Sequence, residues 1–367
     1  MKTMKIITIV CWVVVAAVLL GFAGWFLTGT VFGSRSERWN RNMPLSINIG
    51  NLEALTGPYN AVGTYNVDAA GLNSIHIDWI AGNTTLRPYD GDQIQITEFA
   101  QRELRDNERL HYSASGDTLT IRFIEQNRGA IINMPTKKLE VLVPRELSES
   151  LESLAVDSAS GGVDAEGLNP ATLKVSSISG SVNLSNIVSR SIGIDSTSGS
   201  VTVADALSDT IEIESISGSV RVSGSSARAF DCGTTSGGIN VSGEYGAATL
   251  KTISGRISLD NSAQLSRLET ESTSGSLELW GSFDWVRAET LSGSISVRST
   301  AAPSSLRAES TSGSITVAVP NEGSVTVNHS SVSGRFSSDI PVIMQNGDAQ
   351  FVLSTISGRI SIIELEG

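Results

Sequence analysis

A serine-glycine pair recurs along the chain at almost constant spacing, and this repeat constrains the fold more than any other feature of the sequence. The successive glycines are separated by 19, 19, 19, 19, 18, 20, 18, 20, 21 and 24 residues. A fixed period of this length is typical of solenoids, in which each repeat contacts only its neighbours. The glycines are Gly161, Gly180, Gly199, Gly218, Gly237, Gly255, Gly275, Gly293, Gly313, Gly334 and Gly358.

Apolar residues occupy fixed positions relative to each of these glycines. In the repeat of Gly218 they are Ile211 and Ile213 before it and Val220 and Val222 after it, with polar residues between them. Alternation with a period of two on both sides of a turn indicates two short β-strands per repeat. Because one such pair cannot bury its apolar face alone, we expect the repeats to stack about 4.8 Å apart. The sequence therefore predicts an all-β fold, a single-stack β-solenoid (β-helix) of about 19 residues per coil.

Two columns of hydroxyl-bearing residues accompany the glycines. The residue before each glycine is serine in all eleven coils, and the residue three before it is always serine or threonine. These hydroxyl groups could line a sugar-binding surface, or they could bond the backbone of the turn and of the neighbouring coil. Alternation places both columns on the inward side, which favours the structural ladder. The glycine suits a corner that needs either a positive φ or close contact between coils.

A further column, two residues before each glycine, is predicted to face outward. Apolar residues and threonine alternate in it from coil to coil, beginning with Ile178, Thr197 and Ile216. Such a column could present a banded surface to a binding partner. Isoleucine and threonine also suit β-strands for their own sake, and we favour this simpler interpretation.

Stacked carboxylates form a candidate cation site. Glu271, Glu289 and Glu309 stand four residues before the glycine in successive coils. Their stems should lie about 4.8 Å apart on the outer face, where a cation could bridge them. Arg287 and Arg307 stand two residues earlier on the same face, so diagonal salt bridges explain the set without a metal ion. We favour the salt bridges.

The segment before the repeat also has the character of β-structure. Residues 45–150 contain alternating stretches at 74–80, 93–96 and 118–123, but they lack the Ser-Gly register. Terminal repeats of solenoids are usually atypical. We therefore expect irregular, larger coils over residues 45–150, which cap a regular solenoid of eleven Ser-Gly coils over residues 151–367.

Several short motifs carry a resemblance to a known family. They are R-P-Y-D-G-D-Q-I from Arg87, G-D-T-L-T-I from Gly116, L-E-V-L-V-P from Leu139, and the repeated S-x-S-G-S-V-x-V coils. In order and repetition they resemble the bacterial putative-adhesin family of β-strand-repeat proteins, a family of unknown function. The resemblance covers roughly residues 60–367. It implies a β-solenoid and supplies no catalytic residues.

An apolar run at the N-terminus predicts attachment to a membrane. Residues 6–27 are uncharged and, as a helix, would be long enough to cross the hydrocarbon core. The alternative is a signal peptide cleaved after Ala23, but the apolar run continues beyond that point. We expect residues 1–28 to be an N-terminal membrane anchor or signal sequence, and residues 29–44 a tether. The chain would then be a single-pass protein of the cell membrane with an extracytoplasmic C-terminal domain.

Composition and isolated reactive residues argue against several classes of function. The formal net charge of -12 excludes nucleic acid as a natural partner, since phosphates require clustered Lys and Arg. Cys232 lies in an apolar column and is expected to be buried and inert. His76, His111 and His329 show no metal-ligand spacing. We therefore expect no catalytic site, no metal site and no cofactor, and the protein is predicted not to be an enzyme.

Two classes of function remain open from the sequence. The first is a membrane-anchored, adhesin-like binding module whose solenoid binds a surface glycan or protein. The second is a structural or envelope-stress component that acts by self-association. The second class would use the C-terminal coil around Gly358, because no capping helix follows Ile362 and an open solenoid end is a template for another chain. The longer loops at 317–331 and 339–349 could instead fold over this end and shield it.

Overall fold

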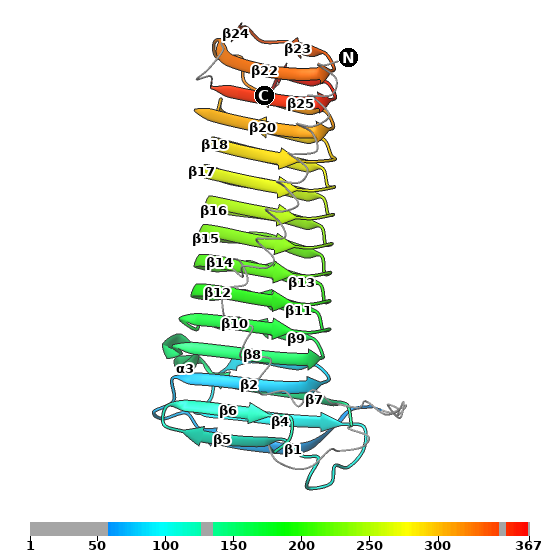
Figure 1. Cartoon of the computed structure of the whole chain (residues 1–367). Coiled ribbons are helices and arrows are strands. Elements are labelled where there is room, and N and C mark those ends of the chain that lie inside the picture. Colours follow the sequence, from blue (N-terminus) through cyan, green and yellow to red (C-terminus); the bar gives the residue numbers. More distant parts are fainter. Residues whose placement is uncertain (1–57, 126–134, 345–349, 366–367) are drawn as a thin grey trace. The chain divides into compact units, whose positions relative to one another are not determined.

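Twenty-six strands of one sheet form most of the computed structural model, which describes residues 58–125, 135–344 and 350–365. The predicted all-β solenoid is confirmed: strand follows strand up the stack, coil on coil (Figure 1). Within the described ranges the only helix is α3 (Arg145–Ser150), and it is neither long nor apolar enough to cross a bilayer. The predicted anchor at residues 6–27 and the tether at 29–44 lie outside the described residues.

Each coil contributes one strand to each of two parallel rows, which meet at the Ser-Gly turn. The first row, before the turn, contains β2 (Ser74–Ala81), β8 (Ser153–Ser160), β10 (Thr172–Ser177), β12 (Val188–Ser196), β14 (Leu207–Ser215), β20 (Ser305–Ser312), β22 (Val325–Ser333) and β25 (Phe351–Ser357). The second row, after the turn, contains β3 (Thr84–Tyr89), β9 (Val163–Glu166), β11 (Val182–Ser185), β13 (Val201–Ala204), β19 (Ile295–Ser299), β21 (Ile315–Val319), β23 (Phe336–Ser338) and β26 (Ile360–Glu364). Four longer strands run through both rows: β15 (Val220–Thr234), β16 (Ile239–Thr252), β17 (Ile257–Ser272) and β18 (Leu277–Thr290).

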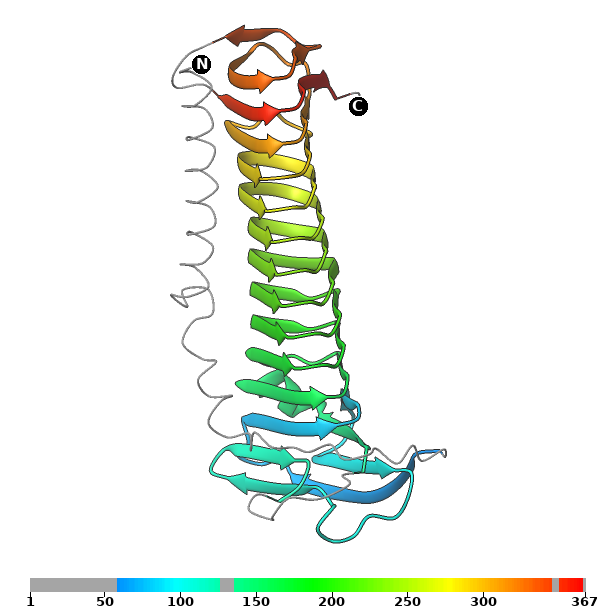
Figure 2. The same cartoon turned by 45° about the vertical axis from the view of Figure 1, so that its right-hand side comes forward.

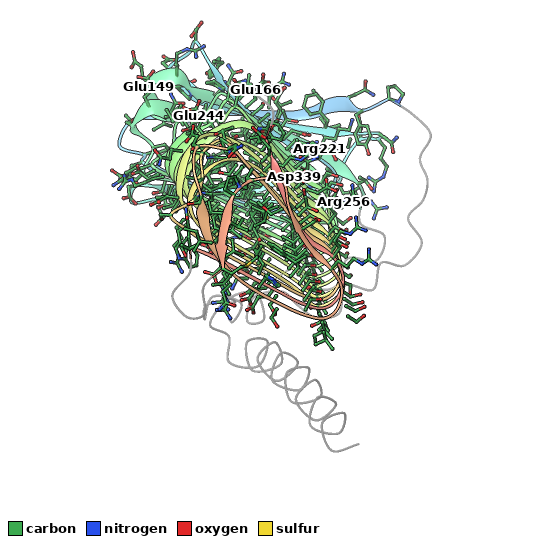
Figure 3. All side chains as sticks on the ribbon, turned by 90° about the horizontal axis from the view of Figure 1, so that it is seen from above. Glu149, Glu166, Arg221, Glu244, Arg256 and Asp339 are labelled. Atoms are coloured by element: carbon green, nitrogen blue, oxygen red, sulfur yellow. The ribbon has the colours of Figure 1, made fainter. Side chains whose placement is uncertain are left out.

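The apolar columns predicted from the sequence form the core. In the first row Ile192, Ile211 and Phe230 lie opposite one another in consecutive coils, and in the second row Val201 lies opposite Val220. All of these side chains are buried. Viewed along the stack, charged side chains such as those of Glu166 and Arg256 project outward from the coils (Figure 3). The period-two alternation therefore sorts inward from outward residues correctly along both rows, up to the residues of the turn itself.

Close contact between coils, and not a positive φ, explains the glycine at the turn. None of the eleven glycines has a positive φ. A Cβ atom added to Gly218 would overlap the carbonyl oxygen of Gly199, and one added to Gly199 would overlap that of Gly180. The glycines thus form one column in which each backbone lies directly against the next. Any side chain here would force the coils apart.

A second corner, six residues after the glycine, does require a left-handed backbone. Gly167, Asn186, Asp205 and Gly224 have φ values of 69°, 53°, 53° and 61°. Glycine, asparagine and aspartate tolerate this conformation best. In the longer strand β17 the same position is Asn261, which does not have a positive φ. Its side-chain oxygen accepts a hydrogen bond from the Tyr245 amide (2.8 Å). The Gly, Asn or Asp residue six positions after each of the first seven turn glycines was the sequence signal for this corner.

The N-terminal end of the stack contains a coil that lacks the Ser-Gly motif. Strands β2 and β3 pair in register with β8 and β9, and Gly82 takes the position of the turn glycine below Gly161. The remaining strands form a cap beneath this coil, in which β4 pairs antiparallel with β7, β5 with β6, and β1 with β4. The cap strands are β1 (Asn60–Asp68), β4 (Gln93–Ala100), β5 (His111–Ser115), β6 (Thr118–Arg122) and β7 (Lys137–Pro144).

The C-terminal end departs from the order expected from the sequence. Strand β25 pairs with β20 on one side and β22 on the other, and β26 lies likewise between β21 and β23. The last coil of the chain is therefore inserted between the two preceding coils, as the red strand between the golden and orange strands shows (Figure 2). The expectation that the coil of Gly358 forms the open end is wrong. The outermost strands are β22, β23 and β24 (Val342–Met344), which pairs with β22.

Candidate functional site

The buried hydroxyl column stabilises the turns and offers no sugar-binding surface. Ser177 donates a hydrogen bond to the Gly180 carbonyl (2.9 Å) and accepts one from the Gly180 amide (3.0 Å). In later coils the hydroxyl reaches the neighbouring coil, since Thr290 donates to the Gly275 carbonyl at 3.1 Å. These side chains are buried, so they satisfy polar backbone groups of the turn that would otherwise be unpaired. The structural ladder predicted from the sequence is confirmed for this column.

The serine directly before each glycine faces outward, contrary to the inward position predicted by alternation. Ser179, Ser198 and Ser217 are exposed, because the chain has already begun to turn at this position. Their hydroxyl groups still donate to backbone one coil away, as Ser179 does to the Ala159 carbonyl at 3.3 Å. The adjacent column of Ile178, Thr197 and Ile216 is exposed as predicted. Together these residues form an exposed ridge of serine, threonine and isoleucine along the Ser-Gly corner.

The stacked carboxylates of the first row are joined to basic side chains. Arg287 lies 2.8 Å from Glu289, and Arg307 lies 2.6 Å from Glu309 and 4.0 Å from Glu289. Lys251 lies 3.4 Å from Glu271. The predicted diagonal salt bridge is present between Arg307 and Glu289, and the other pairs lie within a coil or between neighbouring coils. In the described ranges no group of three or more His, Cys, Asp or Glu side chains could hold a metal ion.

Further down the same face, carboxylates cluster, and one of them, Asp195, lies 3.7 Å from the Lys174 ammonium. Glu214 lies opposite Asp195 in the coil below, and Glu212 lies opposite Asp231 in the coil above. Burial, together with repulsion from these three carboxylates, raises the pKa of Glu214 to about 7. This part of the outer face is therefore strongly acidic and would repel a polyanion.

The outer face of the second row carries an exposed tryptophan among charged side chains. Trp280, at the end of this part of β18, is 44% exposed. It lies opposite Asp260 in one neighbouring coil and Arg298 in the other, with the Arg298 guanidinium 5.8 Å from its ring centroid. Glu278, two residues earlier, lies 3.6 Å from Arg256. We call Trp280, Asp260, Glu278 and Arg298 the tryptophan face.

A buried ion pair, not evident from the sequence pattern, closes the N-terminal end of the core. The side chains of Lys137 and Glu98 are fully buried, with the ammonium nitrogen 2.7 Å from a carboxylate oxygen. The Lys137 ammonium also donates to the Glu108 carbonyl (2.6 Å) and the Phe123 carbonyl (2.5 Å). Burial lowers the pKa of Lys137 to about 8, although Glu98 opposes this shift. The sequence signal for a buried charge was Lys137 at the start of β7, where it alternates with the inward residues Leu139 and Val141.

The cysteine and the three histidines considered as reactive residues do not form a common site. Cys232 is buried as predicted, and burial raises the pKa of its thiol. His76 bonds to Asp157 in the adjacent coil (2.9 Å). His329 is exposed and stacks on Phe336, with ring centroids 4.2 Å apart. His111 lies in β5, so the described structure brings none of the three histidines into a common site.

The family match agrees with the solenoid fold. The family described as Toastrack DUF4097 matches residues 72–280 and 244–362. No curated protein matches the chain. A solved "putative adhesin" from Parabacteroides distasonis is 14% identical, with coverage of 84% of this chain and 98% of that chain and a TM-score of 0.40. A "putative lipid binding protein" from the same organism is 13% identical, with coverage of 83% and 96% and a TM-score of 0.35.

Proposed function

The chain belongs to the Toastrack DUF4097 family, and we propose that its solenoid is a non-catalytic binding module displayed on the outside of a cell membrane. Residues 6–27 would anchor it, and the stack would project from the tether at residues 29–44. The hydroxyl groups of the turns and the buried ion pair are committed to holding the coils together. Chemically varied groups available to a ligand therefore lie on the outer faces.

The observation that carries this proposal is the tryptophan face. An exposed indole ring can stack on the apolar C–H face of a pyranose ring, while neighbouring charged groups bond its hydroxyl groups. Trp280 supplies the ring, and Asp260, Glu278 and Arg298 supply acceptors and donors around it. The parallel strands hold these side chains at a fixed spacing, so binding would need little ordering of the site. We therefore propose a surface glycan as the ligand.

A binding experiment on the full chain in a mild detergent tests this function. We expect a glycan array, followed by titration of the best soluble oligosaccharide, to show binding that Trp280→Ala weakens about tenfold or more. Leu207→Ala, which removes another exposed apolar side chain from the side of the stack, should leave the affinity unchanged. Absence of glycan binding, or equal loss in both variants, would contradict the proposal.

Protease protection tests the proposed topology independently. Protease added to intact cells or spheroplasts should digest residues 45–367, whereas a cytoplasmic marker protein should survive. Full protection of the solenoid until the cells are lysed would contradict an extracytoplasmic location.

A further inference from the structure

The C-terminal end of the stack terminates in strands that are paired on one side only. Strand β22 pairs with β25 from Val327 to Ser333, whereas β24 covers its other edge only from Val325 to Val327. Strand β23 pairs with β26 alone. Within the described part of the chain, the outer edges of residues 328–333 and 336–338 therefore lack a partner strand. Unpaired edges of this kind are templates for another strand.

The apolar columns also end uncovered at this point. His329 and Phe336 occupy inward columns that are buried in the other coils, but His329 is exposed and Phe336 half-buried. Their rings stack at an interplanar angle of 3°. Between them the buried Ser331 hydroxyl has no hydrogen-bond partner in the structure, although its counterparts in most other coils bond a glycine carbonyl or amide. The interior of the outermost coil, formed by β22 and β23, is thus built like that of the inner coils, each of which is covered by a further coil.

Exposed apolar side chains surround this uncovered section. Val332 is 62% exposed, and Ile343 and Met344 are each 53% exposed. Large exposed apolar patches on soluble domains mark interaction sites. We call the surface formed by His329, Val332, Phe336, Ile343 and Met344, with the unpaired edges of β22 and β23, the end face.

We infer that the end face binds the same face of a second copy, which makes a closed, end-to-end dimer. Strand β22 runs toward the turn at Gly334 and β23 runs away from it. A two-fold axis through this turn exchanges the two rows, so β22 would lie antiparallel to the partner's β23, and β23 to the partner's β22. Each unpaired edge then faces a strand of the partner, over the length of the three-residue strand β23, and the two-fold symmetry closes the assembly.

Other occupants fit this surface less well. A single extended peptide would pair with β22 or with β23, which lie in different rows, and would leave the second edge open. A second copy presents one strand to each of the two open edges, in antiparallel pairing instead of the parallel pairing between the coils of one chain. The inference is independent of glycan binding, because the tryptophan face lies on the side of the stack and not at its end.

The mass of the full chain in a mild nonionic detergent tests the dimer. Sedimentation velocity, with bound detergent subtracted, should give a dimer at micromolar concentration. The double variant His329→Asp/Phe336→Asp places four like charges at the interface and should raise the dissociation constant by about 100-fold or more. The substituted side chains are already exposed or half-buried, so the variant should melt close to the parent protein once both are diluted until they are monomeric. Leu207→Asp adds a comparable charge on the side of the stack and should leave the dimer intact.

Cross-linking locates the interface. In a Cys11→Ser background, where Cys232 is buried, Ser333→Cys lies beside the proposed axis and should give an oxidised dimer on a non-reducing gel. Ser160→Cys, an exposed serine at the same corner in the lower half of the stack, should not. A monomer throughout the micromolar range, a dimer unaffected by the double aspartate variant, or equal cross-linking from both cysteines would overturn the inference.

Discussion

At each end of the stack the apolar core has to be covered and the last strand edges have to be paired, and the two ends differ in how this is done. At the N-terminal end the last parallel level is followed by antiparallel strands, and the fully buried Lys137–Glu98 pair closes the core. At the C-terminal end parallel coils continue to the last level, where β24 covers only part of β22. One end is therefore closed within the chain, whereas at the other end, among the described residues, the outer edges of β22 and β23 lack a partner strand.

The difference shows that covering the core and satisfying the strand edges are separate problems. The cap gives Ile75, Ile77 and Trp79 of the first coil a complete environment, with all three buried. At the opposite end the inserted coil of β25 and β26 is equally well packed, but the coil displaced outward is not. Insertion of the final coil moves the open end from the end of the chain to an internal segment.

Among changes at the two ends, removal of the buried Lys137 ammonium should lower the free energy of unfolding most. Lys137→Met leaves the Glu98 carboxylate buried and unpaired, which should cost about 3–5 kcal/mol in the free energy of unfolding. The second change Glu98→Gln removes that charge and should recover part of the loss. Denaturant titration measures both variants, with Phe336→Ala at the open end as a control that costs about 1 kcal/mol or less. A Lys137→Met protein as stable as the control would show that the ion pair does not close the N-terminal end.

Alanine in place of the first or the last glycine of the column, Gly82 or Gly334, should give the next largest difference in stability between the two ends. A Cβ on Gly82 would overlap the Lys137 carbonyl, and Gly82 also has a φ of 97°. A Cβ on Gly334 would overlap the Gly358 carbonyl, but the outermost coil can move away. We expect Gly82→Ala to cost about 3 kcal/mol and Gly334→Ala about 1 kcal/mol in thermal or chemical unfolding. Equal costs would mean that both terminal coils are held with the same rigidity.

Hydrogen exchange should show a difference of opening free energy between the ends. Amides of β22, β23 and β24 in the monomeric double aspartate variant should exchange through local opening that costs about 2 kcal/mol less than opening of β2 and β3. The cause is the smaller buried apolar surface of the outer coil. Protection of β22 at or above that of β2 would contradict an open C-terminal end.

Titration of His76 should produce the smallest effect, confined to the N-terminal end. Its hydrogen bond to Asp157 raises the pKa of His76 above the ordinary value, although burial opposes the shift. A histidine with a raised pKa in the folded state contributes stability that is complete below its unfolded pKa, about 6.5, and is lost as the pH rises through the folded pKa. Because the pair is partly exposed, we expect a few tenths of a kcal/mol. His76→Gln should abolish this part of the pH dependence between pH 6 and 8, and an unchanged profile would argue against the pair.

The candidate surfaces were predictable from the sequence only in part. The carboxylate column and its arginine partners follow from spacing, because Arg287 and Glu289 are neighbours on one strand face. The tryptophan face was missed, since Trp280 gains its neighbours Asp260 and Arg298 only from adjacent coils. The outward serines such as Ser179 were placed inward, because strict alternation ends where the turn begins.

The sequence by itself determined the coil: its length, its two strands, its inward columns and the glycine contact, because these depend on residues within one period and on its regular repetition. The tertiary structure alone decided how the ends are built. Gly82 joins the glycine column without a preceding serine, Lys137 reaches Glu98 across the cap, and Gly358 enters between Gly313 and Gly334. Every coil presents nearly the same edge to its neighbours, so the repeat does not specify which coil pairs with which. That choice depends on the balance of buried surface and paired backbone over the whole stack.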